Sequence, residues 1–331
     1  MPSSHASCTE VSAQCPVEAT TLGYYPNLGA NIFFVVLYAL CTIFTLGVGL
    51  WKKTWVFGVV VSAGFALETC GYIGRVLMHY NPWSDPGFKL DLVCIILAPT
   101  LICAGIYLTL KHVARTVGPD FSRITPRLYT WIFIPFDVFC LCLQGVGGGV
   151  DAAASDKTPI DEKTLKTGND IIIAGIALQV VNLAVFGLLS LDFFVSAMKH
   201  FKNPSEKVRN SANAQIWYSR RFRVFCSAIA CAYAGILVRC IYRVAEMAGG
   251  WGNSIMRNEV LFYVLEGAMV LYPAMLLTIF APGFYFPEMG SSNALLTSST
   301  DTATGTENNA VVSNEGYKPG TPEEGAESSN H

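Results

Sequence analysis

Residues 29–50 read GANIFFVVLYALCTIFTLGVGL and contain no charged side chain. A helix needs about 20 mostly apolar residues to cross the hydrocarbon core of a bilayer. Six later stretches meet the same requirement, so that the predicted spans are approximately 29–50, 54–77, 88–110, 129–149, 170–195, 224–246 and 260–281. The sequence therefore predicts an all-α integral membrane bundle of seven transmembrane helices.

The composition is typical of a membrane protein. Hydrophobic residues make up 52% of the 331-residue chain and charged residues only 14%, against about 25% charged residues in soluble domains. The net charge of −2 gives no reason to expect nucleic-acid binding. The chain has no G-x-x-x-x-G-K-S/T loop, and its five histidines lie outside the predicted spans. We therefore expect no enzymatic activity, no cofactor and no metal.

The distribution of Lys and Arg predicts the orientation in the membrane. These residues are enriched in cytoplasmic loops. Here they concentrate in the first, third and fifth loops between the predicted spans. The opposite side has only Lys89, Lys157, Lys163, Lys166 and Arg257, and the segment before the first span has none. The N-terminus is therefore predicted outside and the C-terminus in the cytoplasm.

The chain is predicted to divide into three parts. Residues 1–28 form an extracellular tail, residues 29–286 the seven-helix domain, and residues 287–331 a disordered, acidic, Ser/Thr-rich cytoplasmic tail. Cys8 and Cys15 lie in the N-terminal tail and are candidates for a disulfide, with two free thiols as the alternative. The other cysteines fall in apolar stretches and are expected to be small core residues.

Many polar residues lie inside the predicted spans, where they are costly and are functional candidates by default. They are Glu68, Arg75, Asp91, Asp137, Gln144, Gln179, Asn182, Arg239, Arg243, Glu246 and Glu266. A helical rise of about 1.5 Å per residue places most of them in the outer half of the membrane. Five of them are carboxyl groups and three are arginines. This pattern predicts a modestly anionic polar cavity, open to the outside, that favours a cationic amphiphile.

Several polar pairs are seven residues apart and therefore share a helix face. These pairs are Glu68 and Arg75, Asp137 and Gln144, Arg239 and Glu246, and Glu259 and Glu266. Members of such a pair are about 10 Å apart along the helix, so their partners must come from elsewhere. At its predicted depth, Glu68 should pair with Arg239 or Arg243 if their helices face each other. Two interpretations stay open, namely a packing network of ion pairs and a path for a substrate or a proton.

An ordered set of motifs runs along these spans. It comprises YPNLGAN at 25–31, ETCGYIGR at 68–75, Asp137 with QGVGGG at 144–149, Gly175 with Gln179, RCIYRVAE at 239–246, and Glu259. The set resembles the fungal lipid-translocating exporter family over residues 24–286. Glu266 departs from the aspartate of the family pattern but keeps a carboxylate.

The resemblance implies a plasma-membrane transporter or translocator of amphiphilic lipids, such as sphingoid bases or aminosterols, that can confer resistance to toxic lipids. Its partners would be membrane lipids and the lipid substrate, and the sequence does not indicate an oligomeric state. The alternative is a seven-helix lipid-sensing receptor with cytoplasmic signalling. The third span ends in YLTLK at 107–111, without a D-R-Y-like motif, and the seventh has no N-P-x-x-Y motif. These absences disfavour the receptor.

Overall fold

The computed structural model describes residues 8–20, 22–118, 121–155, 162–202, 212–250 and 253–285. In this part of the chain, seven helical segments are long and apolar enough to cross a membrane. The predicted seven-helix membrane bundle is therefore confirmed. The predicted disordered tail, residues 287–331, lies outside the described residues.

The helices follow one another along the chain and are connected by short loops where the loops are described. The first four are α1 (Leu28–Trp51), α2 (Trp55–Tyr80), α3 (Asp85–Val117) and α4 (Pro126–Ser155). They are followed by α5 (Glu162–Lys202), the short α7 (Ala212–Tyr218) and α8 (Arg220–Ala248). The seventh span is built from α9 (Glu259–Phe262), the π-helix η4 (Tyr263–Ala268) and α10 (Met269–Ile279), after which comes α11 (Pro282–Tyr285).

Several helices are longer than the spans predicted from hydropathy. The predicted span 170–195 is the middle of α5, which runs from Glu162 to Lys202, and α3 continues to Val117 instead of ending near residue 110. An apolar stretch marks only the part of a helix that lipid surrounds. Polar turns at both ends continue the same backbone hydrogen bonding and give no hydropathy signal.

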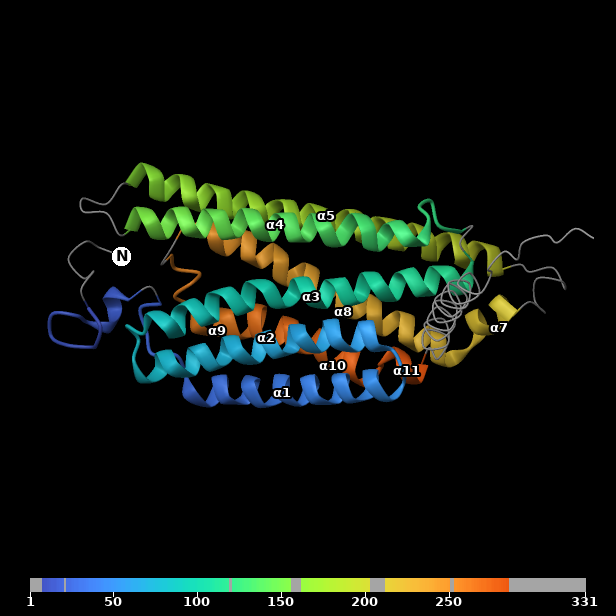
Figure 1. The fold of residues 1–331 in the computed structure, drawn as a ribbon, viewed down its shortest axis with the longest axis horizontal. Coiled ribbons are helices and arrows are strands. Elements are labelled where there is room, and N and C mark those ends of the chain that lie inside the picture. Colours follow the sequence, from blue (N-terminus) through green and yellow to red (C-terminus); the bar gives the residue numbers. More distant parts are fainter. Residues whose placement is uncertain are drawn as a thin grey trace, which may run out of the picture.

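The spans run side by side along the bundle (Figure 1), and their contacts connect them in a closed ring. In this ring α2 packs against α1 and α3, α4 against α3 and α5, and α8 against α5 and α10, while α10 returns to α1. The helix α3 also contacts α5 and α8 across the ring. Its buried positions therefore face neighbours on several sides, and α3 is the central helix of the bundle.

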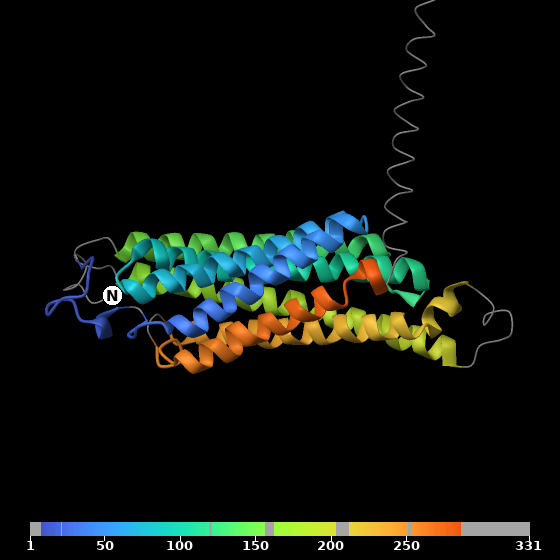
Figure 2. The same ribbon diagram turned by 90° about the horizontal axis from the view of Figure 1, so that it is seen from below.

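An N-terminal segment, residues 8–20 and 22–27, lies at one end of the bundle, whereas α7 lies at the other end (Figures 1 and 2). Within this segment Cys8 and Cys15 form a disulfide. The backbone carbonyl of Cys15 accepts a hydrogen bond from Trp83 Nε1 at 3.3 Å, and Pro26 O lies 2.7 Å from His79 Nδ1. The helices α1, α3 and α9 begin at this end and are capped by Asn27, Ser84 and Asn258. The N-terminal segment therefore rests on capped helix ends.

Candidate functional site

Arg75 joins four parts of the chain near the end of the bundle that the N-terminal segment covers. Its Nη1 atom lies 3.3 Å from Asp91 Oδ2 on α3, and its Nη2 atom donates a hydrogen bond of 2.8 Å to the hydroxyl of Tyr24. Its guanidinium carbon is 3.7 Å from the ring centroid of Phe262 in the seventh span. Burial raises the pKa of Tyr24, which lies before the first span. The Tyr24 hydroxyl therefore stays neutral, and its oxygen accepts the hydrogen bond from the Arg75 guanidinium.

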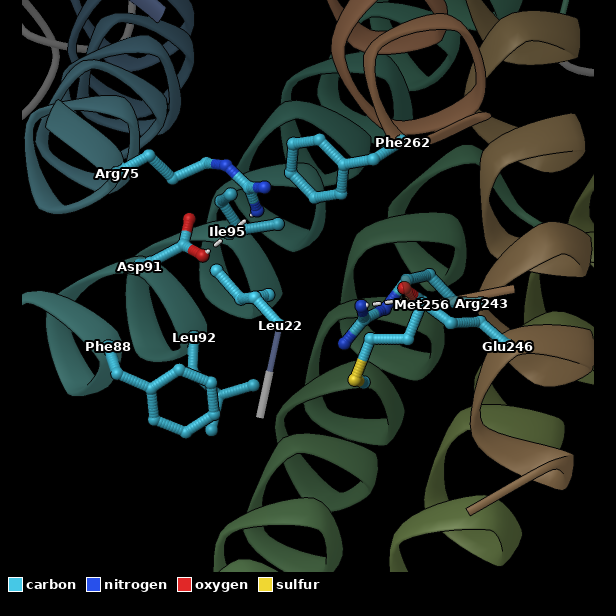
Figure 3. Close-up of a pocket in the computed structure, with 10 residues that line it drawn as sticks. All are labelled: Leu22, Arg75, Phe88, Asp91, Leu92, Ile95, Arg243, Glu246, Met256 and Phe262. Carbon is cyan, nitrogen blue, oxygen red and sulfur yellow. Dashed lines mark hydrogen bonds and ion pairs between the residues drawn. The ribbon is translucent and has the colours of Figure 1, made fainter. Parts of the chain in front are cut away.

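A second ion pair lies across a small cavity from Arg75. Arg243 Nη1 is 2.6 Å from Glu246 Oε2, one turn further along α8. The cavity between the two pairs has a volume of about 40 Å³, and Leu22 of the N-terminal segment lies in its wall (Figure 3). This space is large enough for water molecules but too small for a lipid head group. The polar cavity predicted from the sequence is therefore small here and partly walled by the N-terminal segment.

A third ion pair lies deeper in the bundle, between α8 and the π-helix. Arg239 Nη2 donates a hydrogen bond to Glu266 Oε1 and another of 2.7 Å to the backbone oxygen of Ile95 on α3. Ile95 also lines the cavity between the first two pairs. The third pair is therefore directly connected to the cavity wall. We call Arg75, Asp91, Arg239, Glu266, Arg243, Glu246 and Glu68 together the ionic cluster.

Glu68 is the member of the ionic cluster that has no ion-pair partner among the described residues. Its side chain is 1% exposed, and its Oε1 atom accepts no hydrogen bond in the described part of the chain. It lies close enough to Arg239 and Glu266 to interact with both electrostatically. The expected pairing of Glu68 with an arginine of α8 is therefore not formed, because Arg239 binds Glu266 and Arg243 binds Glu246.

Aromatic rings surround this part of the cluster. Phe34 stacks on Tyr72 with ring centroids 4.8 Å apart, and Tyr38 stacks on Tyr72 at 5.6 Å. The hydroxyl of Tyr38 donates a hydrogen bond of 2.9 Å to Gly267 O in the π-helix. Such packing separates Glu68 from lipid on the side of α1.

A separate line of polar side chains joins α3, α4 and α5. Asp137 accepts hydrogen bonds from Tyr107 at 2.9 Å and from Asn182 at 2.7 Å. Gln144 Nε2 donates to Gln179 Oε1 at 3.1 Å, and Gln179 Nε2 donates to Thr100 at 3.0 Å. These donors are neutral, so Asp137 is satisfied by hydrogen bonds and not by a cation.

Glu259 lies apart from both groups, at the start of the seventh span. Its Oε1 atom accepts a hydrogen bond of 2.6 Å from the backbone nitrogen of Asn27 and one of 3.0 Å from the Tyr263 hydroxyl. A carboxylate at the N-termini of α1 and α9 is favoured by both helix dipoles. In this structure Glu259 therefore ties two helix ends together, and its partners differ from those of Glu266.

Two glycines allow the helices that carry these groups to approach closely. A Cβ atom at Gly74 would lie 2.7 Å from Gly87 O and 2.9 Å from Asp91 N on α3. A Cβ atom at Gly175 would lie 2.8 Å from Gln144 Cγ. Small residues permit such contacts between membrane helices. Gly74 therefore sets the α2–α3 distance beside the Arg75–Asp91 pair, and Gly175 does the same beside Gln144.

Comparison with known proteins shows the family to which the chain belongs. A family model described as RTA1 like protein matches residues 61–289. The chain belongs to the RTA1-like family. No solved structure matches it.

Three fungal relatives of this RTA1-like protein have names that specify different transported compounds. The sphingoid long-chain base transporter RSB1 of Saccharomyces cerevisiae is 30% identical over 292 residues, which cover 82% of this chain and 75% of that protein. The lipid-translocating exporter-like protein RTA1 of Leptosphaeria maculans is 27% identical, over 83% of this chain and 53% of its own length. Protoporphyrin uptake protein 1 of S. cerevisiae is 28% identical, over 67% of each chain. The resemblance to lipid-translocating exporters is confirmed.

The structure distributes the residues predicted for the RTA1-like site over three places. Glu68, Arg75, Arg239, Arg243, Glu246 and Glu266 meet in the ionic cluster, Asp137, Gln144 and Gln179 lie in the polar line, and Glu259 lies at the helix ends. Sequence reasoning missed Tyr24, Tyr107 and Phe262, whose partners come from distant segments. No local pattern marks these aromatic residues. Among the described residues, no group of three His, Cys, Asp or Glu side chains is arranged to hold a metal ion.

Proposed function

We propose that this RTA1-like protein is a transporter or translocator that moves an amphiphilic lipid with a cationic head group, of the sphingoid-base or aminosterol type, across the membrane. The observation that carries the proposal is a buried cluster of three arginines and four carboxyl groups inside the spans of a protein similar to a named sphingoid long-chain base transporter. Packing a bundle does not require so many buried charges, which are costly and usually functional in membranes.

The excess of carboxyl groups supports a cationic head group. The cluster also supports a lipid substrate, because it is buried within spans whose outer faces are apolar, so a ligand can keep its chain in the bilayer while its head enters. The cavity of about 40 Å³ is too small for a lipid head group. A transport cycle therefore needs the helices, or the N-terminal segment with Leu22, to move apart.

The protein is a multi-pass membrane protein, and we place it in the plasma membrane with the N-terminal segment outside. The names of its relatives describe transport and export, so an enzymatic activity is not proposed. The receptor alternative gains no support from these names. A lipid transporter located in this way would lower the amount of a toxic lipid in one leaflet and so confer resistance.

The test is lipid flux in vesicles that contain only the purified full-length protein. The panel consists of a long-chain amino alcohol, an aminosterol, an N-acylated and therefore neutral long-chain lipid, and a porphyrin. The control variant is Asp192→Asn, which removes a carboxylate from an exposed ion pair with Arg123, far from the cluster. We expect faster movement of the amines than in protein-free vesicles, for the wild type and the control alike. Flux equal to that of protein-free vesicles for every lipid would refute transport, and specific binding without flux would favour the receptor.

A further inference from the structure

The ionic cluster has one carboxyl group more than it has arginines. Arg75 pairs with Asp91, Arg239 with Glu266, and Arg243 with Glu246. Each arginine is thus assigned to one carboxylate in the described structure, and Glu68 remains. Asp137 also lacks a cation in the described part of the chain, but its two neutral donors satisfy it outside the cluster.

Among the residues that the structure describes, the surroundings of Glu68 contain no second cation that could neutralise it. The ionisable groups that interact with it come from every neighbouring element. They are Tyr38 on α1, Tyr72 on α2, Asp91 and Cys94 on α3, Arg239 on α8, and Glu266 on η4. Arg239 is the one positive group among them, and it is already hydrogen-bonded to Glu266 and Ile95 O. The remaining groups are neutral or negative.

A charged carboxylate in such a site is expensive. Burying an isolated ion in a medium of low dielectric constant costs far more than burying its neutral form. The surplus carboxyl group at this position therefore binds either a proton or a cation from outside the chain. The unpartnered Oε1 atom of Glu68 is free to bind either one.

We propose that Glu68 is an exchange site at which a proton and the ammonium group of an amino lipid replace each other, one for one. The inference rests on the proposed transport of a cationic lipid. In the exchange, the O–H bond of the neutral carboxyl group breaks and its proton passes to water, while the ammonium group forms an N–H···O hydrogen bond with the carboxylate. The total charge of the site does not change.

The three ion pairs set the stoichiometry of this exchange. Because each arginine neutralises one carboxylate, only one site in the cluster can accept a proton or an amine. If Arg239 turned from Glu266 to Glu68, the surplus would move to Glu266, whose Oε2 atom also lacks a hydrogen-bond partner in the described part of the chain. The count of one proton per amine would be the same. Lipid transport coupled in this way would be driven by a pH difference across the membrane.

The test measures proton release when an amine binds to the full-length protein in weakly buffered detergent solution. The probes are a long-chain amino alcohol and its N-acetylated, neutral analogue. We expect about one proton released per amine bound and none for the neutral analogue. Over the pH range in which the site is protonated and the amine charged, amine affinity should rise about tenfold for each unit of increasing pH, because fewer protons compete.

Variants at position 68 and a control variant test whether the released proton comes from Glu68. Glu68→Gln should stay folded, since it breaks no hydrogen bond at Oε1, and should bind amine weakly without releasing a proton. Glu68→Asp keeps a carboxyl group and should keep proton release, as should the control Asp192→Asn. The wild-type comparison of amine and neutral lipid needs no variant, so the test stands even if Glu68→Gln does not fold.

The possible failures can be told apart. Amine binding and flux without proton release or pH dependence would overturn the exchange and leave lipid transport standing. Proton release that persists in folded Glu68→Gln would overturn the role of Glu68. Neither binding nor flux of any lipid would overturn the proposed function and the exchange together.

Discussion

Replacing Arg75 with methionine tests whether burial or distance decides the strength of an ion pair in this bundle. The substitution leaves Asp91 buried without its cation, and removes the hydrogen bond to Tyr24 and the contact with the Phe262 ring. Breaking a buried pair from one side costs about 3–5 kcal/mol in soluble proteins, and a desolvated ring contact adds about 1–2 kcal/mol. We expect the free energy of unfolding to fall by about 4 kcal/mol, since such contributions are not additive.

The matched control is Arg123→Met. The Arg123–Asp192 pair is the shorter of the two, at 2.7 Å against 3.3 Å for Arg75–Asp91, but the Arg123 side chain is 76% exposed. Exposed pairs contribute little because water and salt screen them. If the distance between the charged atoms decided the strength of an ion pair, Arg123→Met would lower the stability more than Arg75→Met. Because the Arg123 side chain is exposed, we expect Arg123→Met to have no resolvable effect on the free energy of unfolding.

Unfolding can be followed by titration with a denaturing detergent, using a dye that reacts with thiols as they become exposed. Cys94, Cys103 and Cys240 are buried in the folded protein and report on the core. The double variant Arg75→Met/Asp91→Asn should recover part of the lost stability, because no charge is then left unpaired. Equal stability losses for Arg75→Met and Arg123→Met, or no recovery in the double variant, would refute the reasoning.

Three further predictions concern orientation, the C-terminal tail and helix contacts. A tag at the C-terminus should be inaccessible to antibody on intact cells and accessible after permeabilisation; labelling of intact cells would reverse the predicted orientation. Truncation after Pro287 should leave lipid flux and surface abundance unchanged, and lost flux at normal abundance would show that the tail takes part in transport. Gly74→Ala should reduce thermal stability, because its Cβ would lie 2.7 Å from Gly87 O, whereas Gly145→Ala, with nothing within 4 Å, should be neutral or slightly stabilising. The opposite order of the two melting temperatures would contradict the close α2–α3 contact.

The number and order of spans were predictable because hydropathy sums over about 20 residues, so that single polar side chains do not hide the signal. The burial of the predicted charges was predictable for a related reason. A charge within an apolar span normally faces protein rather than lipid, and Glu68, Arg239 and Glu266 are each at most 4% exposed.

The pairing of these charges was not predictable from the sequence. Depth along the helix follows from residue numbers, and it placed Glu68 and Arg239 at one level. Whether two residues at one level meet depends on the rotation of each helix about its axis and on its neighbours in the ring. Arg239 faces Glu266 because α8 packs against the seventh span. The contribution of Tyr24 depends on the path of the N-terminal segment, which hydropathy does not describe.

The π-helix η4 gives the seventh span a register that the spacing of its residues does not reveal. It includes Glu266 and Gly267, and each π-turn holds about one residue more than an α-turn. One extra residue corresponds to a rotation of roughly 100° about the helix axis. Without the extra residue of the π-turn, the Glu266 carboxylate would be rotated by this angle relative to the start of the span and would point away from Arg239. The Arg239–Glu266 pair therefore depends on the π-turn as well as on the packing of α8 against the seventh span.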